Sequence, residues 1–173
     1  MSCRAIVVMG VAGCGKSSLG LALAQHLGWR FVEGDDHHSD ESWAKMRRGE
    51  SLNDADRVPW LNLLADMLSG EVGATGGVVL SCSALKQAYR EQLRAATPAL
   101  GFIYLELNPE QALARVAARA GGHGFPASLV QSQFDALEPP LDEPLVLRLN
   151  AMLSPAEQLQ LAQQWQPSAA MPA

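Results

Sequence analysis

The chain has 173 residues, of which 48% are hydrophobic, and its formal net charge is −5. This length and composition predict one domain with a full hydrophobic core. The acidic balance argues against a general nucleic-acid binder, because affinity for a phosphate backbone rests on clustered lysine and arginine. No run approaches the roughly 18 apolar residues of a membrane-spanning helix, so we expect no membrane partner.

The cysteines and the first residues of the chain favour a reducing compartment. Cys3, Cys14 and Cys82 are too few and too scattered for a disulfide framework or a zinc site. The segment up to Met9 carries one arginine and a short apolar run, which predicts a first strand rather than a signal peptide. We therefore expect a cytoplasmic protein.

Apolar runs and helical patterns alternate along the chain. The runs are continuous, which is typical of strands buried on both faces of a parallel sheet. In chain order they cover residues 5–9, 31–32, 78–82, 102–107 and 145–149.

Helical stretches lie between and after these runs. The first follows a glycine-rich loop at 10–17 and carries leucines every four residues. A short helix capped by Ser39 and a longer one with Pro59 in its first turn separate the second and third strands. Asn108 and Ser154 each begin a capping-box pattern ahead of a later helix. The alternation predicts an α/β three-layer sandwich around a five-stranded parallel sheet.

We expect residues 1–166 to form a single domain. Glycines at 121, 122 and 124 interrupt two helical stretches, and this pattern predicts a short lid at about 119–127. Residues 167–173 are rich in proline and alanine and are expected to form a flexible tail.

Residues 10–17 match the phosphate-loop pattern G-x-x-x-x-G-K-[ST] in full. Glycines permit a tight turn whose backbone N–H groups point inward, and the following helix adds its positive N-terminal dipole. Lys16 is expected to reach the β- and γ-phosphates, and the Ser17 hydroxyl to bind Mg²⁺. The expected ATP-binding residues are Gly10, Val11, Ala12, Gly13, Cys14, Gly15, Lys16, Ser17 and Ser18. The loop alone does not choose between kinase, GTPase and ATPase.

An acidic segment, residues 33–38, follows the second predicted strand. Groups beyond the carboxyl ends of parallel strands face the ligand crevice. Asp35 is therefore predicted to help hold Mg²⁺ and to accept the proton of an attacking alcohol. His37 and His38 are not expected to bind a metal, because adjacent histidines point in different directions and no third ligand is placed beside them.

Together these motifs resemble the gluconokinase family, a relative of shikimate kinase. The resemblance rests on the phosphate loop, on the acidic segment and on five further blocks. These are Lys45-Met46 with Gly49, Asn53 to Leu61, Cys82 to Lys86 with Tyr89-Arg90, Phe102 to Leu105, and Ser132-Gln133-Phe134 with Leu137-Glu138. The resemblance implies Mg²⁺- and ATP-dependent phosphorylation of D-gluconate at its 6-hydroxyl, and it implies a homodimer.

A sugar acid needs a cation for its carboxylate and hydrogen-bonding groups for its hydroxyls. Arg57 is the first candidate, because a guanidinium can bind a carboxylate with two parallel hydrogen bonds. The alternative is that Arg57 pairs with Asp54 or Asp56 at the start of its helix. Lys86 and Arg90 are four residues apart and are further substrate-binding candidates, although Arg90 fits an ordinary helix position equally well.

Arg115 and Arg119 lead into the expected lid. In the family such arginines close over ATP and neutralise phosphate charge, so Arg115 is a candidate for ATP binding and Arg119 for catalysis. The family's Gly-His-Phe block is altered here, because Gly124 stands between His123 and Phe125. The alteration predicts a looser lid, and His123 stays a candidate for substrate binding.

Two other functions fit parts of the sequence. A shikimate-type kinase is expected to carry three glycines after the third strand, where residues 81–86 read Ser-Cys-Ser-Ala-Leu-Lys instead. A nucleotide-dependent switch is expected to place an aspartate at the end of a core strand, which this third strand lacks. Trp60 and Phe134 are expected to pack in the core rather than stack on a sugar, and Cys14 and Cys82 to fill space.

Overall fold

Five parallel strands form one sheet in the order β2-β3-β1-β4-β5. The computed structural model describes residues 3–119, 126 and 128–170. The strands are β1 (Ala5–Met9), β2 (Arg30–Glu33), β3 (Val78–Ser81), β4 (Gly101–Glu106) and β5 (Val146–Asn150). The predicted five-stranded parallel sheet is thereby confirmed.

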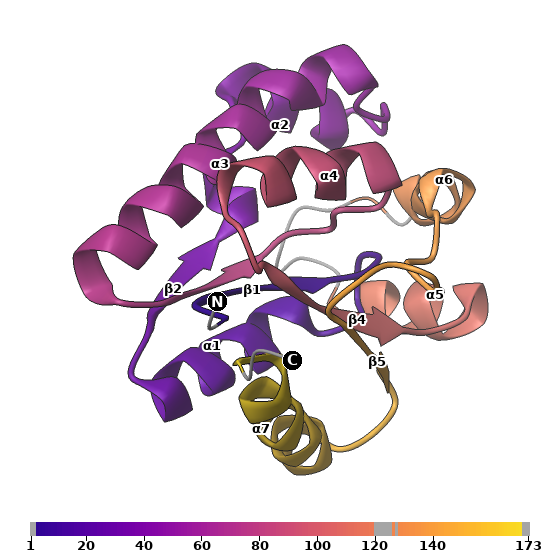
Figure 1. Ribbon diagram of the computed structural model, residues 1–173. Helices are drawn as coiled ribbons and strands as arrows, with labels where there is room; N and C mark the ends of the chain where they lie inside the picture. The colour runs from indigo at the N-terminus through magenta and orange to yellow at the C-terminus, as the bar shows by residue number, and fades with distance from the viewer. Residues whose placement is uncertain (1–2, 120–125, 127, 171–173) are drawn as a thin grey trace.

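Helices cover both faces of the sheet (Figure 1). They are α1 (Lys16–Leu27), α2 (Asp40–Arg47), α3 (Asp54–Thr75), α4 (Gln87–Ala96), α5 (Pro109–Ala118), α6 (Leu129–Ala136) and α7 (Pro155–Ala170), with a 3-10 turn, η1 (Gly34–His37), after β2. Ile6 and Val8 of β1 pack in a core with α1, α5 and α7, whereas Val7 and Met9 pack in a second core with α3 and α4. Burial on both faces explains why the β1 sequence is continuously apolar.

Local capping signals begin the helices where the sequence predicts. Ser39 accepts a hydrogen bond from the backbone N–H of Ser42, and Asn108 forms a full capping box with Gln111. At the other end of the chain, α7 runs from Pro155 to Ala170. The division into a domain at 1–166 and a flexible tail at 167–173 stays a prediction. Of the expected lid at about 119–127, only Arg119 and Pro126 are among the described residues.

The carboxyl ends of β1, β2 and β3 lie at one edge of the sheet because the strands are parallel. Gly34, directly after β2, comes so close to β3 that a Cβ at this position would overlap the carbonyl oxygen of Ser81. Glycine alone permits this approach. The Trp60 indole donates a hydrogen bond of 2.8 Å to the Gly34 carbonyl and thereby ties α3 to the same edge.

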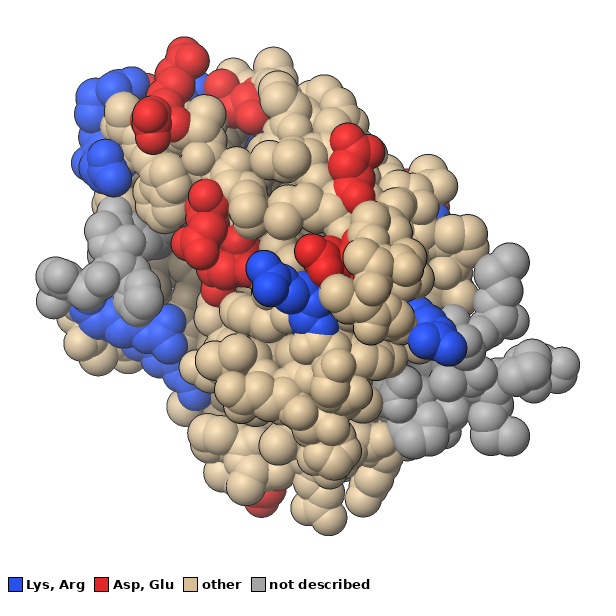
Figure 2. All heavy atoms as spheres, turned by 90° about the vertical axis from the view of Figure 1, so that its left-hand side faces the viewer, with Lys and Arg blue, Asp and Glu red and all other residues tan. Residues whose placement is uncertain are grey.

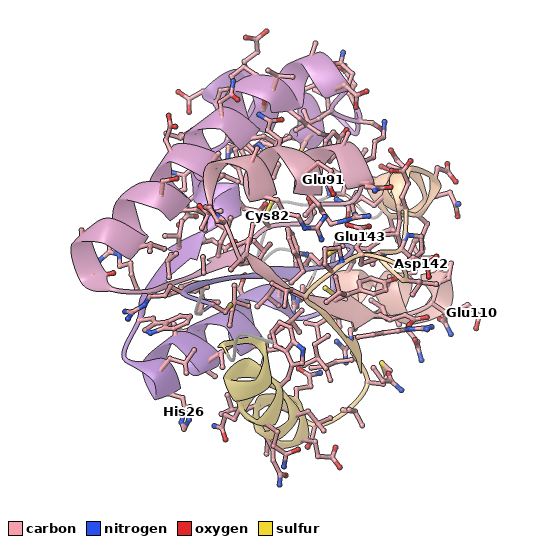
Figure 3. The ribbon with its side chains drawn as sticks, in the orientation of Figure 1. His26, Cys82, Glu91, Glu110, Asp142 and Glu143 are labelled. Carbon is pink, nitrogen blue, oxygen red and sulfur yellow. The ribbon has the colours of Figure 1, made fainter. Side chains whose placement is uncertain are left out.

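A buried ion pair joins α4 to the segment that precedes β5. Arg90 is fully buried, and its guanidinium donates to Glu143 at 2.6 Å and to the carbonyl oxygens of Ala84, Leu85 and Glu138. Figure 3 labels Glu143 close to α4. Our interpretation of Arg90 as a substrate ligand is therefore corrected, because its donors are satisfied inside the protein.

Arg94 shares the same carboxylate at 2.7 Å, so Glu143 balances two arginines. Burial alone would raise the pKa of Glu143, but hydrogen bonds from Arg90 and Arg94 outweigh burial and lower it. Because the carboxyl pKa is lower in the folded state, the ion pair stabilises the fold at pH values above the ordinary carboxyl pKa. That stabilisation is lost as the pH falls through the lowered value.

We predict that Glu143→Ala lowers the free energy of unfolding by about 3–5 kcal/mol at neutral pH, because it leaves buried guanidinium charge without a counterion. Denaturant unfolding followed by circular dichroism measures this difference. Glu91→Ala is the matched control, since Glu91 is more than half exposed and also pairs with Arg94. Equal stabilities of the two variants would contradict the prediction, as would a gap between wild type and Glu143→Ala that does not narrow in acid.

Candidate active site

The phosphate loop runs from the end of β1 to the start of α1. Gly10 has a φ of 146°, and a Cβ there would lie 2.7 Å from the carbonyl oxygen of Leu105, so the turn requires glycine. Lys16 is the first residue of α1, and its ammonium donates to the carbonyl oxygen of Val11 at 3.1 Å. The lysine thus lies over the loop, where loop N–H groups and the helix dipole together attract phosphate oxygens.

Arg115 supports this loop from the side of α5. Its Nη1 donates to the carbonyl oxygens of Gly13 and Cys14 at 3.2 and 3.4 Å, and its Nη2 donates to that of Ala151 at 2.9 Å. Arg115 is not among the residues that line the pocket described below. In this structure Arg115 therefore supports the loop, and its binding to ATP stays a prediction.

A polar cluster joins the phosphate loop to the ends of β2 and β3. The Ser17 hydroxyl donates a hydrogen bond to the Glu33 carboxylate and lies 3.4 Å from the Ser81 hydroxyl. We expected Ser17 here, but Glu33 and Ser81 were not singled out from the sequence. Both are the last residues of neighbouring strands, and this position is the sequence feature that could have identified them as site residues. Hydroxyl and carboxylate oxygens of this kind suit Mg²⁺, which prefers hard oxygen ligands.

A pocket of about 830 Å³ opens beside the loop. The phosphate loop and Arg119 form part of its lining, and residues of η1, α2 and the start of α3, which we call the acceptor half, form another part. Its lining residues are Ala12, Gly13, Gly15, Lys16, Ser17, Ser18, Glu33, Asp35, Asp36, His38, Trp43, Met46, Arg47, Leu52, Arg57, Ser83, Val116, Arg119 and Gln133. The structure therefore brings Lys16, Ser17, Asp35, Arg57 and Arg119 to one cavity, as the sequence predicts.

Asp35 lies in the acceptor half of this pocket beside His38. The His38 Nε2 is 3.8 Å from the Asp35 carboxylate, and the ring stacks on Trp60 with centroids 4.2 Å apart. Trp43 meets the same ring edge-on at 5.9 Å. Burial lowers the pKa of His38, the Asp35 charge opposes that shift, and the Arg57 charge adds to it. The lowered pKa favours the neutral imidazole at neutral pH. The Asp35 side chain is 57% exposed.

Arg57 has no ion-pair partner among the residues that the structure describes. The two nearby acids are engaged elsewhere: Asp54 accepts hydrogen bonds from Lys86 and Tyr89, and Asp56 accepts one from Lys45 at 2.7 Å. The Arg57 guanidinium lies over the Tyr89 ring, and its Nε is buried without a hydrogen-bond partner in the described part of the chain. The alternative pairing of Arg57 with Asp54 or Asp56 is not what the structure contains.

Lys86 lies at the start of α4 and pairs with Asp54 at 3.1 Å. It is not among the pocket-lining residues, so this structure does not bring Lys86 together with Asp35 and Lys16. His123 falls outside the described residues. Arg47 and Ser83 line the pocket and were not singled out from the sequence.

The aromatic residues and cysteines divide largely as predicted. Trp60 of α3 is buried in the core on one face of the sheet, and Phe134 packs against the core on the opposite face. Trp43 lines the pocket. Complete burial raises the pKa of the Cys82 thiol to about 12, so this cysteine is no nucleophile at neutral pH. Figure 3 labels Cys82 inside the molecule.

The fold and the phosphate loop define a P-loop kinase of small molecules. A family model described as shikimate kinase matches residues 12–132. The gluconokinase of Gluconobacter oxydans (strain 621H) is 44% identical over 152 residues, which cover 88% of this chain and 85% of that relative. The chain belongs to the gluconokinase family, which confirms the resemblance noted in the sequence.

Further relatives agree with this family. The thermosensitive gluconokinase of Escherichia coli (strain K12) is 40% identical over 153 residues, covering 87% of this chain and 80% of that protein. The crystal structure of a gluconokinase from Sinorhizobium meliloti 1021 superposes with a TM-score of 0.86 at 39% identity, over 96% of this chain and 93% of the other. The unliganded structure of a sugar kinase from Janibacter sp. HTCC2649 superposes with a TM-score of 0.89 at 36% identity, over 98% of this chain and 99% of the other.

The surface carries charges of both signs in small groups. Figure 2 shows lysine and arginine side chains on one face in separate places, several of them next to aspartate or glutamate. Within the described residues, no helix combines the length and the hydropathy needed to cross a membrane.

We predict different effects for Arg115 of α5 and for Arg119, the residue that caps this helix. Arg115→Met is expected to lower thermal stability and weaken nucleotide binding together, because it releases three backbone carbonyls of the loop region. Arg119→Met is expected to lower kcat about 10²-fold or more at unchanged melting temperature, if exposed Arg119 stabilises phosphoryl charge in the transition state as the sequence predicts. Differential scanning fluorimetry and steady-state kinetics separate the two. A stable Arg115→Met variant with wild-type nucleotide affinity would disprove the supporting role.

Proposed function

We propose that the chain transfers the γ-phosphoryl group of ATP to the 6-hydroxyl of D-gluconate and releases ADP and 6-phospho-D-gluconate. The family and the gluconokinase relatives support the reaction. The observation that carries the choice of substrate is Arg57, a guanidinium in the acceptor half of the pocket whose neighbouring acids are engaged by other groups. A cation in the same pocket as the phosphate loop, without an acidic partner among the described residues, suits an acceptor that carries a carboxylate at the end remote from its reacting hydroxyl.

Asp35 and Lys16 supply the chemistry in this proposal. The gluconate hydroxyl oxygen forms a bond to the γ-phosphorus while the bond from the β,γ-bridging oxygen to that phosphorus breaks. The hydroxyl proton passes to the Asp35 carboxylate, and ADP leaves with the bridging oxygen. Lys16 and Arg119 stabilise the negative charge on the phosphoryl oxygens as the bond order to phosphorus falls.

Mg²⁺ belongs to this proposal as the partner of ATP. The Ser17 hydroxyl would bind the ion, and the carboxylates of Glu33 and Asp35 would hold its water ligands. When bound, Mg²⁺ neutralises phosphate charge and orients the β- and γ-phosphates. The cluster of Ser17, Glu33 and Ser81 fits such an ion because all its ligand atoms are oxygens.

Two further parts of the proposal concern the protein in the cell. We propose a homodimer, on the family resemblance, and a cytoplasmic location, which three free and buried cysteines support. Light scattering after size-exclusion chromatography measures the first.

We predict that Arg57→Ala raises the KM for gluconate roughly tenfold or more and leaves the KM for ATP nearly unchanged, because a charge-assisted bidentate pair is lost. Arg57→Lys should recover only part of the loss, since an ammonium keeps the charge without the planar fork. Arg48→Ala is the matched control, because Arg48 is exposed and paired with Glu50. A coupled assay of ADP release measures these values.

The same assay tests the substrate itself when gluconate is compared with idonate, shikimate and glycerate. The proposal expects the highest kcat/KM for gluconate. ATP hydrolysis at one rate whatever acid is added would contradict phosphoryl transfer, and a preference for shikimate would move the assignment to that kinase.

We predict that Asp35→Asn lowers kcat far more than it changes the KM for gluconate, because the amide keeps the shape of the side chain but accepts no proton at neutral pH. Initial rates at saturating ATP give both constants. Asp40→Asn, at an exposed position of α2 that is not among the pocket-lining residues, is the control. An Asp35 variant with wild-type kcat and a raised KM would make Asp35 a binding residue only.

A further inference from the structure

Helix α6 touches both halves of the pocket. On the acceptor side, Leu129 packs in a small cluster with Met46 and Leu52, and the Ser132 hydroxyl lies 2.6 Å from that of Ser51. On the nucleotide side, Gln133 accepts a hydrogen bond of 2.7 Å from the backbone N–H of Ala12 in the phosphate loop. One short helix thus connects the loop that binds ATP to the segment that lines the acceptor site.

The contact with Ala12 fixes the orientation of the Gln133 amide. A backbone N–H can only donate, so the group that faces Ala12 must be the carbonyl oxygen of the side chain. The amide nitrogen is then turned away from Ala12. This nitrogen has no hydrogen-bond partner among the described residues, and Gln133 lines the pocket. Two donor hydrogens therefore remain for a ligand.

The position of Gln133 indicates which ligand group it meets. Ala12 and Lys16 of the phosphate loop line the same cavity as Asp35 and Arg57 of the acceptor half. In phosphoryl transfer, the group that passes between the two halves is the γ-phosphoryl group. A neutral amide N–H donor at this junction suits a phosphoryl oxygen.

We propose that Gln133 binds the γ-phosphoryl group of ATP through its amide N–H, while its carbonyl oxygen holds the phosphate loop at Ala12. The residue belongs to the Ser132-Gln133-Phe134 block, to which the proposed reaction so far gives no role. The inference rests on ATP binding at the phosphate loop and is independent of the acceptor. Ser51 and Ser132 extend the same connection to the acceptor side.

Gln133→Glu separates the two halves of this role. The carboxylate still accepts a hydrogen bond from Ala12, but it replaces the donor by a negative charge beside the γ-phosphoryl group. Calorimetric titration with Mg²⁺ and either ADP or a non-hydrolysable ATP analogue, without any sugar acid, gives two dissociation constants. We expect the variant to lose about tenfold or more in affinity for the analogue. The affinity for ADP should change less than about threefold, since ADP lacks the group concerned.

Gln131→Glu is the matched control, because Gln131 lies on the same helix, is exposed and donates a hydrogen bond to Asp135. It should leave the ratio of the two affinities as in the wild type. Gln133→Leu, which removes both donor and acceptor, should also lower the ratio of analogue to ADP affinity. A wild-type ratio in either Gln133 variant would overturn the proposal and leave Gln133 as a structural tie. Because no acceptor is present, this failure is distinct from a failure of the gluconate assignment.

Discussion

The approach of β2 to β3 at Gly34 is the constraint on which the site depends. Without a Cβ at this position, the end of β2 lies against the Ser81 carbonyl, and the turn that follows begins directly beside the phosphate loop. The Trp60 indole holds the same backbone from α3. Glu33 thereby contacts Ser17, and Asp35 and Arg57 line the same cavity as the phosphate loop. A larger residue at 34 would separate these groups.

Pairing of charges decides which cations are available to a ligand. Lys45 and Lys86 engage Asp56 and Asp54, the two acids just before Arg57 in the chain, so that Arg57 stays without an acidic partner among the described residues. Arg90 is the opposite case, since its guanidinium is fully buried and bound to Glu143 and to backbone carbonyls. Both arginines fit a sugar-acid site on sequence spacing alone. The two arginines differ in the burial of the side chain and in the groups that accept their hydrogen bonds.

Much of the fold follows from local signals in the sequence. The continuous apolar run at 5–9, the phosphate loop and the capping residues Ser39 and Asn108 predict elements that the structure contains, because each signal acts within a few residues. The predicted nucleotide and acceptor residues Lys16, Asp35 and Arg57 also meet in one pocket. These contacts follow from the parallel sheet, which gathers the carboxyl ends of its strands.

The remaining contacts depend on long-range packing, which a single sequence does not reveal. Arg115 and Arg119 are four residues apart and look equivalent, yet only Arg119 lines the pocket, because Arg115 turns toward carbonyls of the loop and of Ala151. Gln133 meets Ala12 across 121 positions of the chain.

A crystal structure with ADP, Mg²⁺ and D-gluconate tests the central claim most directly, which is that one cavity holds both substrates with the reacting hydroxyl facing the phosphate loop. The account predicts the gluconate carboxylate on the Arg57 guanidinium and the 6-hydroxyl within hydrogen-bonding distance of Asp35. A carboxylate bound at Lys86 or Arg47, with the 6-hydroxyl turned away from Asp35, would contradict it.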